Sequence, residues 1–192
     1  MLLPAWVVPS VLSAVSTLLL LGGQHLADQL RYDRAAVAHG AWWLLLSGNL
    51  VHLGFWHLFL NVLSLVLLVL LCPEPLPLAE WLGRVLVIGT GMSLGLYWLS
   101  PGVQTYVGLS GLIYGLFAIG LGQQAVRGDR IAIAALVFLA GRIGFELQYG
   151  ATPGETRLIG GGIVAESHLW GACSAILYGG ATWLLHTIRT TR

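Results

Sequence analysis

The chain has 192 residues, of which 57% are hydrophobic and only 9% are charged, and its mean hydropathy is +0.83. Soluble domains carry about 25% charged residues, so this composition excludes an ordinary water-soluble fold and predicts an integral membrane protein in a lipid bilayer. The formal net charge of +1 provides no basic field for nucleic acid, which we exclude as a partner.

The N-terminal segment, MLLPAWVVPSVLSAVSTLLLLGG, contains the first apolar stretch, residues 5–22. A secretory signal peptide would have a basic region before this stretch and a small-x-small cleavage site after it, and neither is present in clear form. We therefore expect a transmembrane helix here, since a span needs about 20 mostly apolar residues.

A long connection, residues 23–54, follows the first span and contains AAVAHGAWWLLLSG. This stretch is short for a span. The adjacent Trp42 and Trp43 are typical of the boundary between lipid headgroups and acyl chains. We interpret the connection as an interfacial, partly embedded element.

Five further spans are predicted, at residues 55–71, 81–99, 110–125, 130–148 and 166–187. Backbone polar groups in lipid must be satisfied within their own segment, so these spans are expected to be helices. A proline-rich turn, CPEPLPLAE, precedes the third span, and a glycine-rich loop around Thr152 precedes the sixth. The predicted fold is a single all-α domain, residues 1–192, built as a polytopic bundle of six transmembrane helices.

The distribution of arginines predicts the orientation of this bundle. With six spans both termini share one side, and arginines in short loops favour the cytoplasm. The terminal side would hold Arg84, Arg127, Arg130, Arg189 and Arg192, whereas the opposite side would hold Arg31, Arg34 and Arg157. The termini are therefore expected in the cytoplasm, and the long connection and the glycine-rich loop outside.

Polar residues within spans are expensive and indicate function or specific packing. The segment HLGFWHLFLN contributes His52, His57 and Asn61, of which the last two lie one helical turn apart. Ser110 begins the fourth span and His168 begins the sixth. The predicted topology brings all three groups to the outer ends of their helices, where they can supply a nucleophile, a base and oxyanion donors.

Small residues explain how these groups can meet. Close approach of two helix backbones requires small side chains at intervals of three or four residues. The fourth and sixth spans supply them at Gly111, Gly115, Ala118, Gly122, Gly171, Ala175 and Gly179. Tyr114, one turn after Ser110, can then place its ring beside the imidazole of His168.

Taken singly, each polar residue has a simpler interpretation. A serine among small residues usually packs, a lone histidine near a helix end is usually interfacial, and an asparagine such as Asn61 usually bonds a neighbouring helix. Arg142 and Glu146, one turn apart on the fifth span, would suit a transporter but can pair with one another. No Cys/His spacing fits structural zinc, so we expect neither metal nor cofactor. The joint pattern of serine, histidines and asparagine favours an enzyme.

That pattern resembles the rhomboid family of intramembrane serine proteases. The resemblance rests on GLSG at 108–111 followed by Tyr114, on HLGFWHLFLN, and on HLWG at 168–171, in the family's order. It covers the second to sixth spans. The short length, the six spans and the lack of a soluble domain are most similar to the bacterial rhombosortase subfamily.

The resemblance implies a role for each of these residues. Ser110 corresponds to the nucleophile and His168 to the general base, in a dyad without an aspartate. Asn61 and His57 correspond to side-chain donors of the oxyanion hole, together with the Ser110 backbone N–H. Tyr114 corresponds to the aromatic residue that stacks on the catalytic histidine, and His52 to a supporting residue.

The resemblance also implies a substrate and a location. The substrate would be a single-span membrane protein cut near the outer face, and the subfamily suggests exported proteins with a C-terminal Gly-Gly-type sorting anchor. The enzyme would lie in the bacterial inner membrane with its active site open to the periplasm. A catalytically silent rhomboid-like binder of client helices is the alternative, and the need for an accessory membrane partner is open.

Two positions depart from the family pattern. Many rhomboids have Trp-Arg in the first long loop, whereas this chain has Trp43-Leu44. An arginine is therefore not expected to organise the loop from that position. Gly48 stands where a further histidine is common, so the polar pocket that holds water is expected to be built differently.

Overall fold

The computed structural model describes residues 2–190, so Arg192, used above to predict orientation, lies outside the described residues. Within that range the regular secondary structure is helical except for four two-residue strands. The helices are α1 (Val7–Leu21), α2 (Gly23–Leu30), α3 (Arg34–Ala38), α4 (Leu44–Ser47), α5 (Phe55–Leu71), α6 (Leu78–Leu99), α7 (Ser110–Val126), α8 (Arg130–Tyr149), α9 (Pro153–Ile159) and α10 (Ala165–Thr190). The strands are β1 (Leu2–Leu3), β2 (Tyr32–Asp33), β3 (Leu76–Pro77) and β4 (Thr105–Tyr106).

The six long helices, α1, α5, α6, α7, α8 and α10, fall where the six spans are predicted. Among the described helices, α6 and α8 are long and apolar enough to cross a membrane, and α1 and α2, which meet at a bend of 120°, add a third if they form one span. Helix α5 is apolar but has 17 residues. The all-helical fold is thus confirmed, and the count of six membrane crossings stays a prediction.

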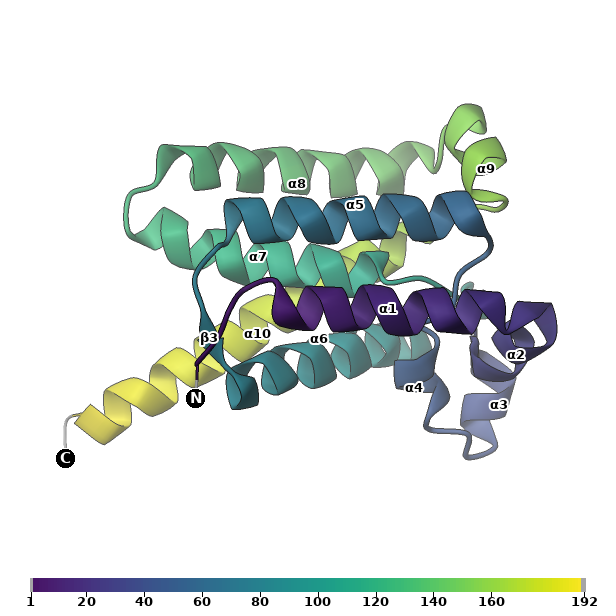
Figure 1. Ribbon diagram of the computed structural model, residues 1–192, viewed down its shortest axis with the longest axis horizontal. Coiled ribbons are helices and arrows are strands. Elements are labelled where there is room, and N and C mark those ends of the chain that lie inside the picture. Colours follow the sequence, from purple (N-terminus) through teal and green to yellow (C-terminus); the bar gives the residue numbers. More distant parts are fainter. Residues whose placement is uncertain (1, 191–192) are drawn as a thin grey trace.

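The long helices run side by side, and α10 passes obliquely behind them, packing against α7 and α6 (Figure 1). Both ends of the described chain lie towards the same end of the bundle, where the N-terminal end lies near β3 and α10 projects beyond it (Figure 1). The short helices α2, α3, α4 and α9 gather at the opposite end (Figure 1). Each end of the bundle contains one short antiparallel pair of strands, β1 with β3 and β2 with β4.

The apolar core lies where α5, α6, α7 and α10 meet. It contains the fully buried Leu65, Ile88 and Leu112, with Ala175 contributed by α10. Large apolar side chains also cover the outside of the bundle, as at Phe138 and Leu177, which are exposed by 73% and 74%. A soluble protein rarely exposes so continuous an apolar surface, so this face suits contact with lipid.

The first long connection is ordered, although it lacks an arginine after Trp43. Arg34, at the start of α3, donates two hydrogen bonds to the carbonyl of Tyr97, at 2.6 and 2.7 Å, and its guanidinium lies 5.3 Å from the centre of that ring. Asp33 caps α3 by accepting from the Ala36 N–H at 2.9 Å. An arginine elsewhere in the loop therefore anchors it, to the C-terminal carbonyls of α6.

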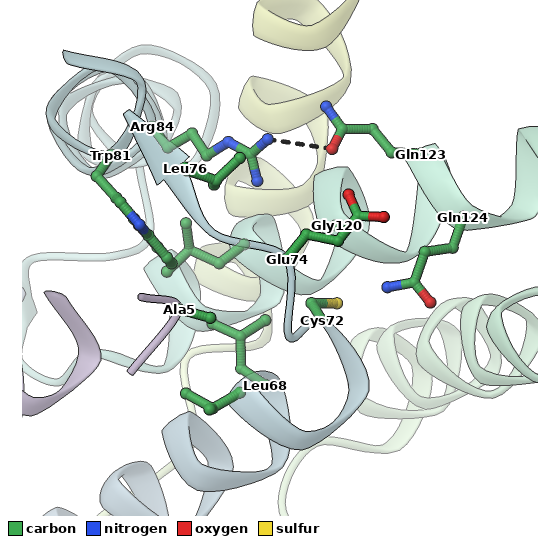
Figure 2. Close-up of a pocket in the computed structure, with 12 residues that line it drawn as sticks. Ala5, Leu68, Cys72, Glu74, Leu76, Trp81, Arg84, Gly120, Gln123 and Gln124 are labelled. Atoms are coloured by element: carbon green, nitrogen blue, oxygen red, sulfur yellow. Dashed lines mark hydrogen bonds between the residues drawn. The ribbon is translucent and has the colours of Figure 1, made fainter. Parts of the chain in front are cut away.

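A small cavity of about 20 Å³ lies at the terminal end of the bundle (Figure 2). The buried Arg84 donates to Gln123 at 3.1 Å there (Figure 2). It also donates to Glu80 at 2.6 Å. This volume suits one water molecule. None of the predicted site residues lines it, so the candidate site must be sought at the other end.

Candidate active site

The turn that leads into α7 holds Ser110 in place. The Tyr106 hydroxyl donates to the carbonyl of Gly108 at 2.6 Å and accepts from the N–H of Gly111 at 3.2 Å. The Gly108 N–H donates to the carbonyl of Gly48 at 3.1 Å. Both ends of the GLSG motif are therefore hydrogen-bonded, which fixes where the first residue of α7 can lie.

Gly108 is required in this turn for two reasons. Its φ of +117° lies in a region that residues with side chains rarely adopt. A Cβ at this position would also lie 2.7 Å from Cε1 and Nε2 of His57. The missing side chain is what allows the His57 ring to lie against the turn that carries Ser110.

Gly48 has a comparable steric reason. A Cβ built on it would lie 2.6 Å from the backbone nitrogen of Tyr32. A histidine would not fit there without moving β2. The departure from the family pattern at this position therefore follows from the close packing of the first connection against α4.

Helices α7 and α10 touch at the level of the site, as the small residues predicted. A Cβ on Gly171 would overlap the carbonyl oxygen of Gly111, and one on Gly115 would lie 2.6 Å from the Gly171 oxygen. The prediction of close backbone approach is confirmed. It brings the N-terminal ends of the two helices, with Ser110 and His168, to one place.

The imidazole of His168 is held on two sides. The Tyr114 ring stacks on it, with the ring centres 4.0 Å apart and an angle of 3° between the planes. Its Nδ1 lies 2.6 Å from Oε2 of Glu146, on α8. His168 is 4% exposed, so bulk water competes little with either contact.

Glu146 belongs to a larger ionic network. Its Oε1 accepts from Nε of Arg142 at 2.8 Å, and Arg142 also bonds Glu155 on α9. Burial raises the pKa of Glu155, but hydrogen bonds from Thr152 and Arg142 outweigh it and hold that pKa below the usual range. Thr152 and Glu155 form the capping box that begins α9.

The sequence interpretation paired Glu146 with Arg142, which is correct, but missed its contact with His168. The available signal was an ionisable residue within a span, which usually marks a functional site. The two residues lie 22 positions apart on different helices. Sequence spacing therefore could not show that they meet.

The predicted side-chain oxyanion donors, His57 and Asn61, both lie on α5. The Leu53 N–H donates to Nδ1 of His57 at 3.4 Å, which leaves the proton of a neutral ring on Nε2. One N–H of the Asn61 amide donates to the His57 carbonyl at 2.9 Å, and the amide has a second. His52 packs edge-on against His57, with the ring centres 5.0 Å apart.

A cavity of about 510 Å³ joins these groups. Five of the six predicted site residues line it, together with Glu146: Ser110, His168, His57, Asn61 and Tyr114. His52 lies behind His57 and is buried. The α9 segment closes one side of the cavity through Glu155 and Leu158.

The arrangement suits acyl transfer. It combines a hydroxyl at a helix N-terminus, a histidine with a free Nε2, and two side-chain donors around one cavity. Between residues 2 and 190 the structure shows no hydrogen bond from Ser110 to His168, and catalytic hydrogen bonds are often long before substrate binds. No group of three metal-binding side chains occurs in the same range.

Comparison with known proteins places these features in context. A family model described as the rhomboid domain matches residues 39–185, more than half of the chain. "Putative rhomboid protease YdcA" of Bacillus subtilis (strain 168) is 29% identical over 143 residues, which are 73% of this chain and 67% of that protein. The family match contains Ser110, His168, His57, Asn61 and Tyr114, which line the cavity.

Proposed function

The chain belongs to the rhomboid family, and from this premise we propose that it is an intramembrane serine endopeptidase with Ser110 as nucleophile and His168 as general base. One observation carries the proposal. Ser110 and His168 line the same cavity, while Tyr114 stacks on the imidazole and an acceptor bonds its Nδ1. That bond leaves Nε2 unprotonated and able to accept the serine proton.

The chemistry proceeds in two steps. His168 Nε2 takes the hydroxyl proton as Ser110 Oγ attacks the scissile carbonyl, and the developing oxyanion is stabilised by the Ser110 N–H, His57 Nε2–H and the second Asn61 N–H. His168 then gives that proton to the leaving amine as the C–N bond breaks. In the second step His168 takes a proton from water as the water attacks the acyl-enzyme. His168 then returns that proton to Ser110 Oγ as the second product leaves.

The apolar surroundings of the cavity support a single-span membrane segment as the substrate. The cavity lies between apolar helices that expose their outer faces, so a single-span helix can approach sideways from lipid. The backbone carbonyls of such a substrate helix are held in i→i+4 hydrogen bonds until the segment unwinds. Glycine or other small residues near its outer end lower that barrier, and small side chains also fit a cavity narrowed by closely packed helices.

We extend the proposal to C-terminal sorting anchors of exported proteins on the strength of the rhombosortase resemblance. Such an anchor combines small residues, an apolar span and basic residues. Its cleavage on the periplasmic side of a bacterial inner membrane would release the exported protein or prepare it for modification. An accessory membrane partner is compatible with this scheme.

Labelling with a fluorophosphonate tests catalytic competence directly. We expect the purified protein to react once per chain, at Ser110, and Ser110→Ala and His168→Ala to abolish both labelling and proteolysis while the protein remains folded. A silent binder of client helices would not label. Retained proteolysis by Ser110→Ala would exclude this serine as the nucleophile.

Co-expression with reporter substrates tests the substrate class. One reporter carries a C-terminal small-residue anchor and a matched reporter carries an N-terminal span, and mass spectrometry of the new C-terminus locates the cut. We expect cleavage of the first, lost when glycines at its outer boundary are changed to leucine. Cleavage of the N-terminal reporter alone would reject the subfamily assignment and leave the protease assignment intact.

A further inference from the structure

The buried carboxylate of Glu146 lies directly behind the candidate general base. Glu146 Oε2 is 2.6 Å from His168 Nδ1, and the Glu146 side chain is 1% exposed. Burying a carboxylate is unfavourable unless hydrogen bonds and opposite charge compensate it. Packing alone does not explain why a buried carboxylate lies against one specific ring nitrogen of His168.

The position of Glu146 on α8 points the same way. In the part of α8 that the structure describes, only Ala132, Ile143 and Glu146 are buried, and most of the helix faces outward. The core-facing side of this helix therefore carries one charged group. That group meets the bundle at His168 rather than at an apolar neighbour.

Arg142 supplies this carboxylate with an oppositely charged donor. Its Nε donates to Oε1 at 2.8 Å, which leaves Oε2 for the imidazole. The arginine side chain is 28% exposed, so its charge is only partly desolvated. Each carboxylate oxygen thus has one donor, and the donor on Oε2 is His168.

We infer that Glu146 is a positioning residue that completes a Ser110–His168–Glu146 triad, an inference that rests on the proposed protease function. By accepting from Nδ1, Glu146 keeps the neutral imidazole protonated there, so that Nε2 is the basic nitrogen facing the cavity. When Nε2 takes the Ser110 proton, the carboxylate stabilises the imidazolium. The Tyr114 ring limits tilting of the imidazole, and Glu146 limits its rotation.

Glu146→Gln should reverse the hydrogen bond at His168 Nδ1. Arg142 Nε–H needs an acceptor, so the amide oxygen of the glutamine would turn towards it and the amide N–H₂ towards His168. An N–H donor facing Nδ1 forces the proton onto Nε2, and the base is lost. In serine proteases with an aspartate triad the corresponding amide substitution lowers kcat by about 10⁴.

Kinetics with a matched control provide the first test. For Glu146→Gln we expect kcat lowered by about 10²–10⁴-fold, fluorophosphonate labelling slowed in parallel, and KM nearly unchanged, because substrate binding does not use Nδ1. The control is Glu80→Gln, which breaks another one-turn Glu–Arg pair, on α6 and away from the cavity. A wild-type kcat in folded Glu146→Gln would overturn the inference.

The tautomer of His168 provides a second test that needs no Glu146 variant. The wild-type protein is labelled with ¹⁵N-histidine, and the His168 signals are identified among six histidines by their loss in His168→Ala. We expect the proton on Nδ1 in wild-type protein; a proton on Nε2 would overturn the inference. If wild-type protein failed to label with fluorophosphonate, the protease proposal would fail, and the tautomer would still report on the bond.

Discussion

Gly171 on α10 lies directly against the carbonyl of Gly111 on α7. At this point the helix that carries the candidate base packs backbone against backbone on the helix that carries the candidate nucleophile. This contact leaves no room for a Cβ between them. The distance between Ser110 and His168 is therefore controlled by a contact between two backbones.

Gly171→Ala should push these helices apart. We expect a loss of about 1–3 kcal/mol in the free energy of unfolding, as for other overpacked sites, and a larger fractional loss of proteolysis than of folded protein. Thermal unfolding in detergent and reporter cleavage measure the two effects. Gly180→Ala is the control on the same helix, because a Cβ there meets nothing within 4 Å; equal behaviour of the two variants would contradict the prediction.

Gly108→Ala should damage the oxyanion site more than the fold. The new side chain is strained at φ +117° and collides with the His57 ring. Displacing one oxyanion donor costs about 10²–10³-fold in rate, so we expect a loss of at least that size in kcat. Gly102→Ala, in an open turn with no neighbour within 4 Å, should retain activity. If Gly108→Ala cleaves the reporter as fast as wild-type protein, the turn does not position His57.

Asn61→Ala and His57→Ala should be partly active. Each removes one donor and leaves the nucleophile and base in place, so we expect kcat lower by about 10²–10³-fold and KM little changed. Ser110→Ala, measured beside them, should be inactive. Steady-state kinetics on a purified reporter decide this, and an unchanged kcat would assign that side chain a structural role.

Arg34→Gln should loosen the first connection. It removes both charge-assisted hydrogen bonds to the Tyr97 carbonyl, each typically contributing about 1.5–3 kcal/mol. We expect faster limited proteolysis between α2 and α4 and a lower melting temperature. Arg130→Gln, at an exposed position that begins α8, serves as the control. Indistinguishable digestion of the two variants would show that Arg34 does not anchor the loop.

Cysteine labelling tests the predicted orientation. Thr152 caps α9, so the exposed Gly154 is the better outer position, and Val126, which is 90% exposed at the end of α7, marks the inner side. In protein lacking Cys72 and Cys173, an impermeant maleimide should label Gly154→Cys in intact spheroplasts and Val126→Cys only after lysis. The reverse pattern would invert the topology.

The helical architecture was predictable because it depends on local properties of the chain. Long apolar runs in lipid must satisfy their own backbone groups, so each run becomes a helix wherever it packs. The GLSG, HLGFWHLFLN and HLWG motifs are also local, because each is a short continuous segment of the sequence. The rhomboid family that they indicated is confirmed by the match to residues 39–185. The close contact of α7 and α10 also followed from small residues at fixed spacing.

Only the tertiary structure decided what lies behind and around those motifs. How each helix is rotated about its axis, and which residues of different helices face one another, depend on the packing of all side chains together. That packing turns Glu146 of α8 towards His168 of α10 rather than leaving it to Arg142 alone. It also assigns the loop anchor to Arg34, because the carbonyls that end α6 lie beside α3 only after folding.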